Sequence, residues 1–277
     1  MGLGMPALGA WVSRSVRGSA YHGSMLDEIV ARIREDLPAQ VEAFDTVRRA
    51  ADARKDHPPS FIEALGGTGL AVIAEVKRRS PSGGDIDRAL EARARADRYV
   101  AGGAAAISVL TERHFFEGSP EDLAEVAESV AVPVLRKDFI IHPVQVWQAR
   151  AWGAAAVLLI AAILDDAQLH MLRREAESLG MAALVEAHDG SEVERALRSG
   201  ASLIGVNNRD LSSFEVDLNT AERLRPLLGE DVVSVAESGV WSAPDARRMR
   251  DAGYDAVLVG EALVRADDPA TLIESFR

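Results

Sequence analysis

The sequence contains no cysteine, and its six histidines are scattered along the chain. Without cysteine there is no disulfide framework, no thiolate metal site and no thiol nucleophile. The histidines do not form, with the acidic residues, a pattern with the spacing of metal ligands, so we expect neither a metal nor another cofactor. The longest apolar run, Ala154–Leu164, is far shorter than the roughly 20 residues that span a bilayer. We therefore expect a soluble protein with no membrane contact.

Basic residues are also fewer than acidic ones. The chain has 31 Lys and Arg residues and 43 Asp and Glu residues, which gives a formal net charge of −12. Such a chain repels polyanions, which argues against nucleic acids or anionic lipids as partners. Any phosphate group must then be held by a local arrangement of donors. The share of hydrophobic residues, 48%, is sufficient for a sizeable buried core.

Acidic residues are absent from residues 1–24, which contain Arg14, Arg17 and several serines. This composition is typical of an organelle transit peptide. The alternative, which we adopt, is a disordered tail or a translation start upstream of Met25, because helical periodicity begins only there. We expect residues 25–277 to form one domain, located in the cytoplasm as a monomer or weak homo-oligomer.

Helical patterns precede the first predicted strand. Apolar residues recur with helical spacing over 27–37, and Pro38 is expected to interrupt or kink that helix. A second helical pattern covers 39–53, and Ser60 with Glu63 predicts a capped short helix. These segments, within 25–69, are expected to be an N-terminal helical extension.

From residue 71 onward, short apolar runs alternate with segments of helical length. Near-continuous apolarity is typical of parallel strands that are buried on both faces. The eight runs are 71–76, 104–110, 132–135, 155–160, 182–185, 203–206, 232–236 and 256–259. Glycine precedes several of them at Gly103, Gly153, Gly200 and Gly253, where a left-handed residue ends a helix. No G-x-G-x-x-G follows any run, so the pattern favours a (βα)8 (TIM) barrel of the α/β class over an open doubly wound sheet.

Charged side chains follow the predicted strands at the barrel end where chemistry is usually located. Glu75 and Lys77 lie two residues apart, so they are expected to point to the same side, into the mouth of the barrel. Alone they could be a structural ion pair. Five further polar residues end other strands, which makes a functional pocket the better interpretation. They are Lys137, Glu186, Asn207, Arg209 and Glu237.

The two lysines leave two mechanisms open. Lys77 and Lys137 at one mouth would lower each other's pKa, which suits both general acid catalysis and imine formation with a carbonyl substrate. His114 and His142 lie near strand ends with no obvious partner, and we interpret them as solvated.

Loop residues suggest where a phosphate would bind. Ser238 with Gly239, and Gly260 with Glu261, follow the last two strands, where backbone N–H groups can bind an anion. Two ordinary tight turns are the alternative. Ser80 begins a glycine-rich loop that is either a lid or a linker.

The strand-end motifs resemble those of the indole-3-glycerol phosphate synthase family. The matching segments are EVKRRSPS at 75–82, TERHFFEGS at 111–119, VLRKDFI at 134–140, LVE at 184–186, GVNNRDL at 205–211 and AESG at 236–239. The similarity extends from about Met25 to the C-terminus. It implies a phosphorylated small-molecule substrate, 1-(2-carboxyphenylamino)-1-deoxyribulose 5-phosphate, which loses carbon dioxide and water during indole ring closure in tryptophan biosynthesis.

The resemblance also implies residue roles. Lys137 is the candidate acid for ring closure, and Lys77, Glu75 and Glu186 serve the later dehydration, with the identity of its base left open. Substrate contacts are expected from Asn207 and Glu237 for the sugar hydroxyls and Arg209 for the departing carboxylate. For the phosphate we expect Ser80, Ser238, Gly239, Gly260 and Glu261, and for the ring Phe116 and Phe139.

Three rival functions remain. Phosphoribosylanthranilate isomerase binds a related phosphate but commonly uses a Cys and Asp pair, and this chain has no cysteine. A Schiff-base aldolase would use Lys137 as a nucleophile. A catalytically idle scaffold would bind phosphorylated ligands without turnover.

Overall fold

The computed structural model describes residues 25–55, 57–81, 83–210 and 213–277. The tail predicted for residues 1–24 lies outside the described residues, as do Ser82 and Leu211 of the quoted motifs. In the described part, no helix is long and apolar enough to cross a membrane.

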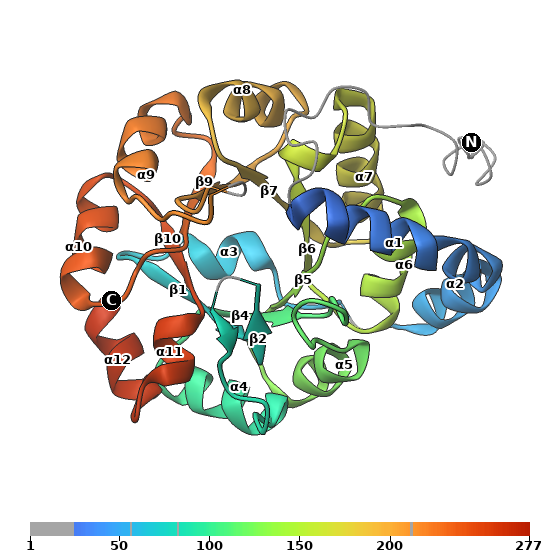
Figure 1. Ribbon diagram of the computed structural model, residues 1–277, viewed down its shortest axis with the longest axis horizontal. Helices are drawn as coiled ribbons and strands as arrows, with labels where there is room; N and C mark the ends of the chain where they lie inside the picture. The colour runs from blue at the N-terminus through green and yellow to red at the C-terminus, as the bar shows by residue number, and fades with distance from the viewer. Residues whose placement is uncertain (1–24, 56, 82, 211–212) are drawn as a thin grey trace.

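Eight parallel strands form a closed barrel, with the order β1-β10-β9-β8-β7-β6-β5-β4 (Figure 1). The barrel strands are β1 (Ala71–Val76), β4 (Ala106–Leu110), β5 (Val134–Lys137), β6 (Ala156–Ile160), β7 (Ala182–Ala187), β8 (Leu203–Asn207), β9 (Val233–Glu237) and β10 (Ala256–Val259). Two short strands, β2 (Arg79–Ser80) and β3 (Gly84–Asp85), pair antiparallel outside the barrel, within the loop after β1. The predicted TIM barrel and its eight strands are confirmed.

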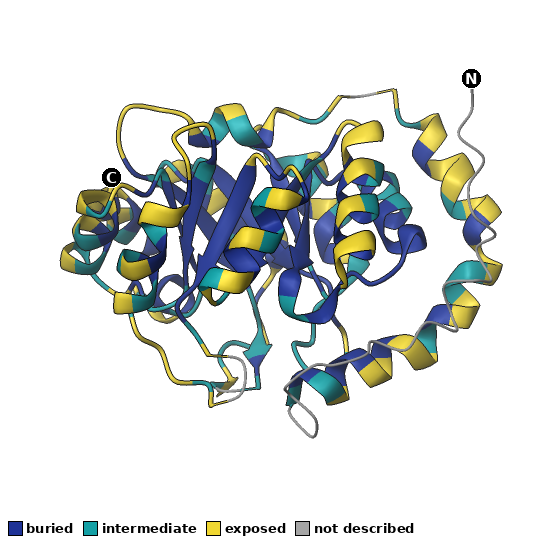
Figure 2. Cartoon of the chain, turned by 90° about the horizontal axis from the view of Figure 1, so that it is seen from above, coloured by how far each residue is buried: buried dark blue, intermediate teal, exposed yellow. Residues whose placement is uncertain are grey.

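Helices surround the barrel, with buried residues on their inner faces and exposed residues on their outer faces (Figure 2). They are α4 (Ala92–Ala101), α5 (Pro120–Ser129), α6 (Pro143–Ala151), α7 (Asp166–Ser178), α8 (Gly190–Arg198), α9 (Asn219–Leu224), α10 (Ala243–Asp251), α11 (Glu261–Arg265) and α12 (Pro269–Phe276), with 3-10 turns η2 (Ala161–Ile163) and η3 (Arg225–Leu227). Gly103, Gly153, Gly200 and Gly253 have φ between 84° and 94°, as predicted for helix-ending glycines.

The N-terminal helices are α1 (Met25–Glu42), α2 (Phe44–Ala53) and α3 (Phe61–Leu65). Of the two effects predicted for Pro38, interruption of the helix is wrong, because α1 continues through this residue and the chain turns at Ala43. Proline costs an intrahelical hydrogen bond. Packing outweighs this cost here, because the buried side chains of Leu37 and Phe44 pack against Val144 of α6.

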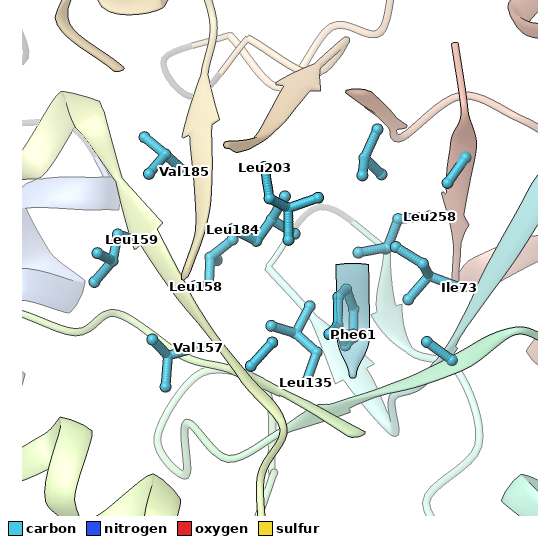
Figure 3. Packing of buried hydrophobic residues seen from close by; sticks show 14 of the residues in the cluster. Phe61, Ile73, Leu135, Val157, Leu158, Leu159, Leu184, Val185, Leu203 and Leu258 are labelled. Carbon is cyan, nitrogen blue, oxygen red and sulfur yellow. The ribbon is translucent and has the colours of Figure 1, made fainter. Parts of the chain in front are cut away.

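Helix α3 lies at the end of the barrel opposite the mouth. Ser60 accepts a hydrogen bond from the Glu63 backbone N–H at 3.2 Å, which confirms the predicted cap. Phe61 is 2% exposed and lies in the barrel core near Ile73 and Leu135 (Figure 3). This aromatic ring therefore fills the core at the end of the barrel opposite the mouth.

Candidate active site

The sequence predicts fourteen residues for catalysis or substrate binding, and all of them line one cavity at the carboxyl ends of the strands. They are Glu75, Lys77, Ser80, Phe116, Lys137, Phe139, Glu186, Asn207, Arg209, Glu237, Ser238, Gly239, Gly260 and Glu261. Their source in seven different βα units shows that barrel closure, rather than proximity in the chain, assembles this cavity.

The first charge pair is the one expected from the spacing of β1. Lys77 Nζ lies 2.8 Å from Glu75 Oε1, and the Glu75 side chain is only 5% exposed. Burial alone would raise the pKa of Glu75, but the ammonium groups of Lys77 and Lys137 outweigh it and hold the pKa below its ordinary value. Glu75 is therefore an ionised carboxylate at neutral pH. Ser108 Oγ of the neighbouring strand β4 lies 3.5 Å from its other oxygen.

Lys137 at the end of β5 lies among acidic groups rather than beside another lysine. Its Nζ is 3.7 Å from Glu186 Oε2 and 3.9 Å from Glu237 Oε2. Burial would lower the pKa of Lys137, but its acidic neighbours, Glu186 foremost, raise it above its ordinary value. The expectation of a lowered lysine pKa is therefore wrong for Lys137. Its side chain is a charged ammonium, which can donate a proton but is not a free amine.

Glu186 and Glu237 are close enough to affect each other's ionisation. Burial and the Glu186 carboxylate raise the pKa of Glu237 well above its ordinary range. For Glu186, burial is outweighed by Lys137, His188 and Asn207, which lower its pKa. Two buried carboxyl groups beside one ammonium cannot both ionise cheaply. Glu186 therefore carries the negative charge, and Glu237 carries the proton.

The end of β8 supplies the amide and the guanidinium. Asn207 Nδ2 donates to Glu186 Oε1 at 3.2 Å, and Asn207 Oδ1 accepts from the Arg209 backbone N–H at 3.0 Å. The Arg209 guanidinium donates to the Phe214 carbonyl at 3.1 Å. These bonds link Arg209 to Asn207 and to Phe214, and they direct Asn207 toward Glu186.

Two glycines make room for the buried carboxyl groups. A Cβ on Gly260 would lie 2.5 Å from Glu75 Oε1, and one on Gly205 would lie 2.0 Å from Glu237 Oε1. The absence of a side chain at Gly260 is thus explained by Glu75, independently of any phosphate. In the loop after β9, Ser238 and Gly239 have φ of 64° and 86°. Consecutive left-handed residues of this kind can form an anion-binding turn.

An aromatic pair lies on one side of the cavity. The rings of Phe116 and Phe139 have centroids 5.9 Å apart. Glu112 fixes the loop that bears Phe116, because its Oε2 accepts the backbone N–H groups of Phe115 and Phe116 at 2.7 and 3.1 Å. The two predicted ring-binding residues are therefore in contact with each other in the cavity.

Sequence reasoning missed part of the cavity wall. Met25, Leu26 and Ile29 of α1 line the cavity, as do Phe214 and Trp241, which is 49% exposed. In Figure 1, α1 lies in front of the barrel beside β5 and β6. Nothing in a local pattern could place this helix over the mouth, because its apolar face is typical of any amphipathic helix.

The histidines also differ from expectation. His142 is fully buried, and its Nδ1 accepts a hydrogen bond from the Val144 backbone N–H at the start of α6, so its interpretation as solvated is wrong. His114 Nε2 contacts Asp36 Oδ2 of α1 at 2.7 Å. His188, which sequence reasoning passed over, contacts Glu186. Its position two residues after Glu186 is the spacing that singled out Glu75 and Lys77.

Comparison with known proteins identifies the family of the chain. The family model described as indole-3-glycerol phosphate synthase matches residues 26–276. A protein of that name from Opitutus terrae is 48% identical over 261 residues, covering 91% of this chain and 98% of the relative. Another, from a Nocardioides species, is 50% identical over 247 residues, covering 89% and 95%.

The solved structures that match this chain at low sequence identity share only its fold. The 3-hexulose-6-phosphate synthase of Salmonella typhimurium has a TM-score of 0.62 at 16% identity, with 75% of this chain and 96% of that chain covered. The thiamine phosphate pyrophosphorylase of Pyrococcus furiosus has a TM-score of 0.57 at 18% identity, with 75% and 94% covered. The family match over nearly the whole described chain is far more specific, and by it the chain belongs to the indole-3-glycerol phosphate synthase family.

Proposed function

We propose that this cavity carries out the indole-3-glycerol phosphate synthase reaction with Lys137 as its principal acid. The reaction converts 1-(2-carboxyphenylamino)-1-deoxyribulose 5-phosphate into indole-3-glycerol phosphate, carbon dioxide and water, in tryptophan biosynthesis. The observation that carries the proposal is the Lys137 ammonium, which is held by Glu186 and Glu237 at 3.7 and 3.9 Å in the cavity.

Ring closure requires an acid at the sugar carbonyl. The ring carbon that bears the carboxylate attacks this carbonyl, and the carbonyl oxygen becomes a hydroxyl when Lys137 delivers a proton. A charged ammonium in a buried site stabilises the developing negative charge on that oxygen. The carboxylate then leaves as carbon dioxide, and its bonding electrons return to the ring system.

Dehydration requires an acid and a base on the same intermediate. Lys77 protonates the departing hydroxyl, and a carboxylate removes the proton from the adjacent carbon. Glu75 and Glu186 are both ionised in this arrangement. Loss of this water and the preceding carbon dioxide accounts for all the atoms that separate substrate and product.

The remaining cavity residues would bind the substrate. We assign the sugar hydroxyls to Asn207 and Glu237, and the departing carboxylate to Arg209. Phe116 and Phe139 would enclose the anthranilate ring. The phosphate would lie in the loops that follow β1, β9 and β10, and the residues assigned to it are Ser80, Ser238, Gly239, Gly260 and Glu261. The Glu261 carboxylate is paired with Arg265 at 2.9 Å, so its backbone rather than its side chain would face an anion.

The imine mechanism of aldolases is less well supported. A Schiff base begins with attack by a neutral amine, whereas the acidic neighbours of Lys137 favour its charged form. Borohydride treatment in the presence of substrate tests this directly. A reduced substrate adduct on Lys137, found by mass spectrometry, would favour the imine mechanism over the acid.

The experiment that tests the proposed function is a fluorescence assay of indole-3-glycerol phosphate formation by the purified full chain. Equimolar release of carbon dioxide would accompany the fluorescent product. Binding of the substrate without either signal would favour the scaffold interpretation. The proposal also places the enzyme in the cytoplasm as a monomer or weak homo-oligomer, which fractionation and light scattering would test.

A further inference from the structure

His188 lies between two buried carboxylates just outside the proposed catalytic set. It follows the last residue of β7, and its side chain is 9% exposed. The ring Nε2 lies 3.2 Å from Glu186 Oε1, and Nδ1 lies 3.2 Å from Glu192 Oε2. The first contact is an ion pair rather than an aligned hydrogen bond. A ring with an acid at each nitrogen can act only through these neighbours.

Glu192 anchors the ring on the side away from the cavity. It lies in the first turn of α8, where its backbone N–H donates to the capping Asp189 Oδ1 at 2.9 Å. Its Oε2 also accepts the His188 backbone N–H at 2.8 Å. The helix cap and this bond fix Glu192 in place, so the imidazole is held by a rigid element.

The consequence falls on the two oxygens of Glu186. Its Oε1 is held from two sides, by Asn207 Nδ2 at 3.2 Å and His188 Nε2 at 3.2 Å. Among the described residues its Oε2 has no hydrogen-bond partner and lies 3.7 Å from Lys137 Nζ. One tethered oxygen and one open oxygen orient the carboxylate toward Lys137 and the cavity.

The charge on the ring adds to this effect. Burial would lower the pKa of His188, but Glu186 and Glu192 outweigh it and raise the pKa to about 10. The charged groups that face it are Glu186, Glu192 and Asp189, all acidic. In the described residues, no group of three or more His, Cys, Asp or Glu side chains could hold a metal ion.

We propose that His188 is a positioning residue, which, anchored on Glu192, holds the Glu186 carboxylate in an oriented and ionised state beside Lys137. This inference rests on the proposed function, because it concerns the same site. Together with the hydrogen bond from Asn207, it explains why Glu186 rather than Glu237 bears the charge. Both carboxyls are buried beside Lys137, but within the described residues only Glu186 has a histidine in contact.

The test compares three variants of the full chain in the fluorescence assay. His188→Leu removes the contact and the charge, His188→Gln keeps an amide donor without the charge, and Glu192→Gln keeps the anchor's shape without its charge. In metal sites, residues that orient a ligand typically contribute about ten- to a hundredfold to activity, and we expect an effect of the same order from His188. We expect kcat to fall by about that factor in His188→Leu, with KM changed less than about threefold. The loss of kcat in His188→Gln should be smaller, because the amide donor remains.

The pH profile separates positioning from a merely structural role. Without the imidazolium, Glu186 becomes harder to ionise, so the acidic limb of the kcat profile moves up by about one pH unit in His188→Gln. Glu192→Gln is expected to move it in the same direction. His170→Gln, on the exposed side of α7, is the matched control and leaves the limb unchanged.

Each outcome decides the inference. Folded His188→Gln and Glu192→Gln chains with wild-type kcat and an unmoved acidic limb would overturn it, even if His188→Leu failed to fold. A wild-type chain that forms no product fails the proposed function instead. In that case the pKa of Glu186, followed by carboxyl NMR, must still rise in His188→Gln for the inference to stand.

Discussion

The Glu237 carboxyl group lies directly against the Gly205 backbone, so that a Cβ at position 205 would stand 2.0 Å from Glu237 Oε1. Gly205 is paired through β8 to the strand that bears Glu237, since Asn207 and Glu237 are register partners. A backbone position on one strand therefore determines where the side chain of the next strand can lie. Gly205 has no functional group, but it shapes the active site because the Glu237 side chain occupies the space that a Cβ would need.

Gly205→Ala is expected to displace Glu237 and reduce both activity and stability. Overpacking of this kind costs about 1–3 kcal/mol of unfolding free energy. Misplacement of a carboxyl beside Lys137 lowers kcat by about tenfold or more. Gly229→Ala is the matched control, because nothing lies within 4 Å of its Cβ position. Equal kcat values for the two variants would contradict the account of Gly205.

Phe61→Ala should weaken the fold while leaving the chemistry in place. The ring is 2% exposed at the closed end of the barrel, and truncation of a buried phenylalanine costs about 3–5 kcal/mol. Leu227→Ala, at a side chain that is 49% exposed, is the comparison and should change stability by less than about 0.5 kcal/mol. Urea denaturation measures both, and a Phe61→Ala chain as stable as Leu227→Ala would exclude the packing role.

Stability should depend on pH through His188. Its pKa is raised from 6.5 to about 10, so the folded state binds its proton more tightly than the unfolded state. The resulting stabilisation is fully present below about pH 6.5 and is lost as the pH rises through 10. By the usual conversion it amounts to at most about 5 kcal/mol.

The measurement is the free energy of unfolding of wild type and His188→Asn at pH 7, 8.5 and 10. The wild-type value should approach that of the variant as the pH rises. His57→Asn, at an exposed position, is the matched control for the replacement itself. A pH-independent difference for His188→Asn would show that the ring is not charged in the folded state.

The barrel could be predicted because buried parallel strands are nearly all apolar, a local property of the sequence. The predicted ends were less accurate for a physical reason. Lys137, Asn207 and Glu237 belong to β5, β8 and β9, yet their polarity ended each predicted run too early. Strand hydrogen bonding continues where the side chains turn from the core to the ligand cavity.

The residues that were missed act through contacts between distant segments. Pro38 is tolerated because its neighbours Leu37 and Phe44 pack on α6, and α1 lines the cavity together with strand ends far along the chain. The raised pKa of Lys137 depends on acidic residues of three other strands, β7, β9 and β1. The sequence does not show that these acidic residues, and not the second lysine, determine the pKa of Lys137. The candidate residues were recognisable from strand ends, but their ionisation required the closed barrel.

The measurement that tests the central claim most directly is kcat for Lys137→Ala in the fluorescence assay, beside Lys55→Ala at an exposed lysine. Loss of the acid that protonates the carbonyl oxygen should lower kcat by at least about a hundredfold, with unchanged circular dichroism and substrate binding. Lys55→Ala should match wild type. Near-normal turnover by a folded Lys137→Ala chain would contradict the account and remove Lys137 from the chemistry.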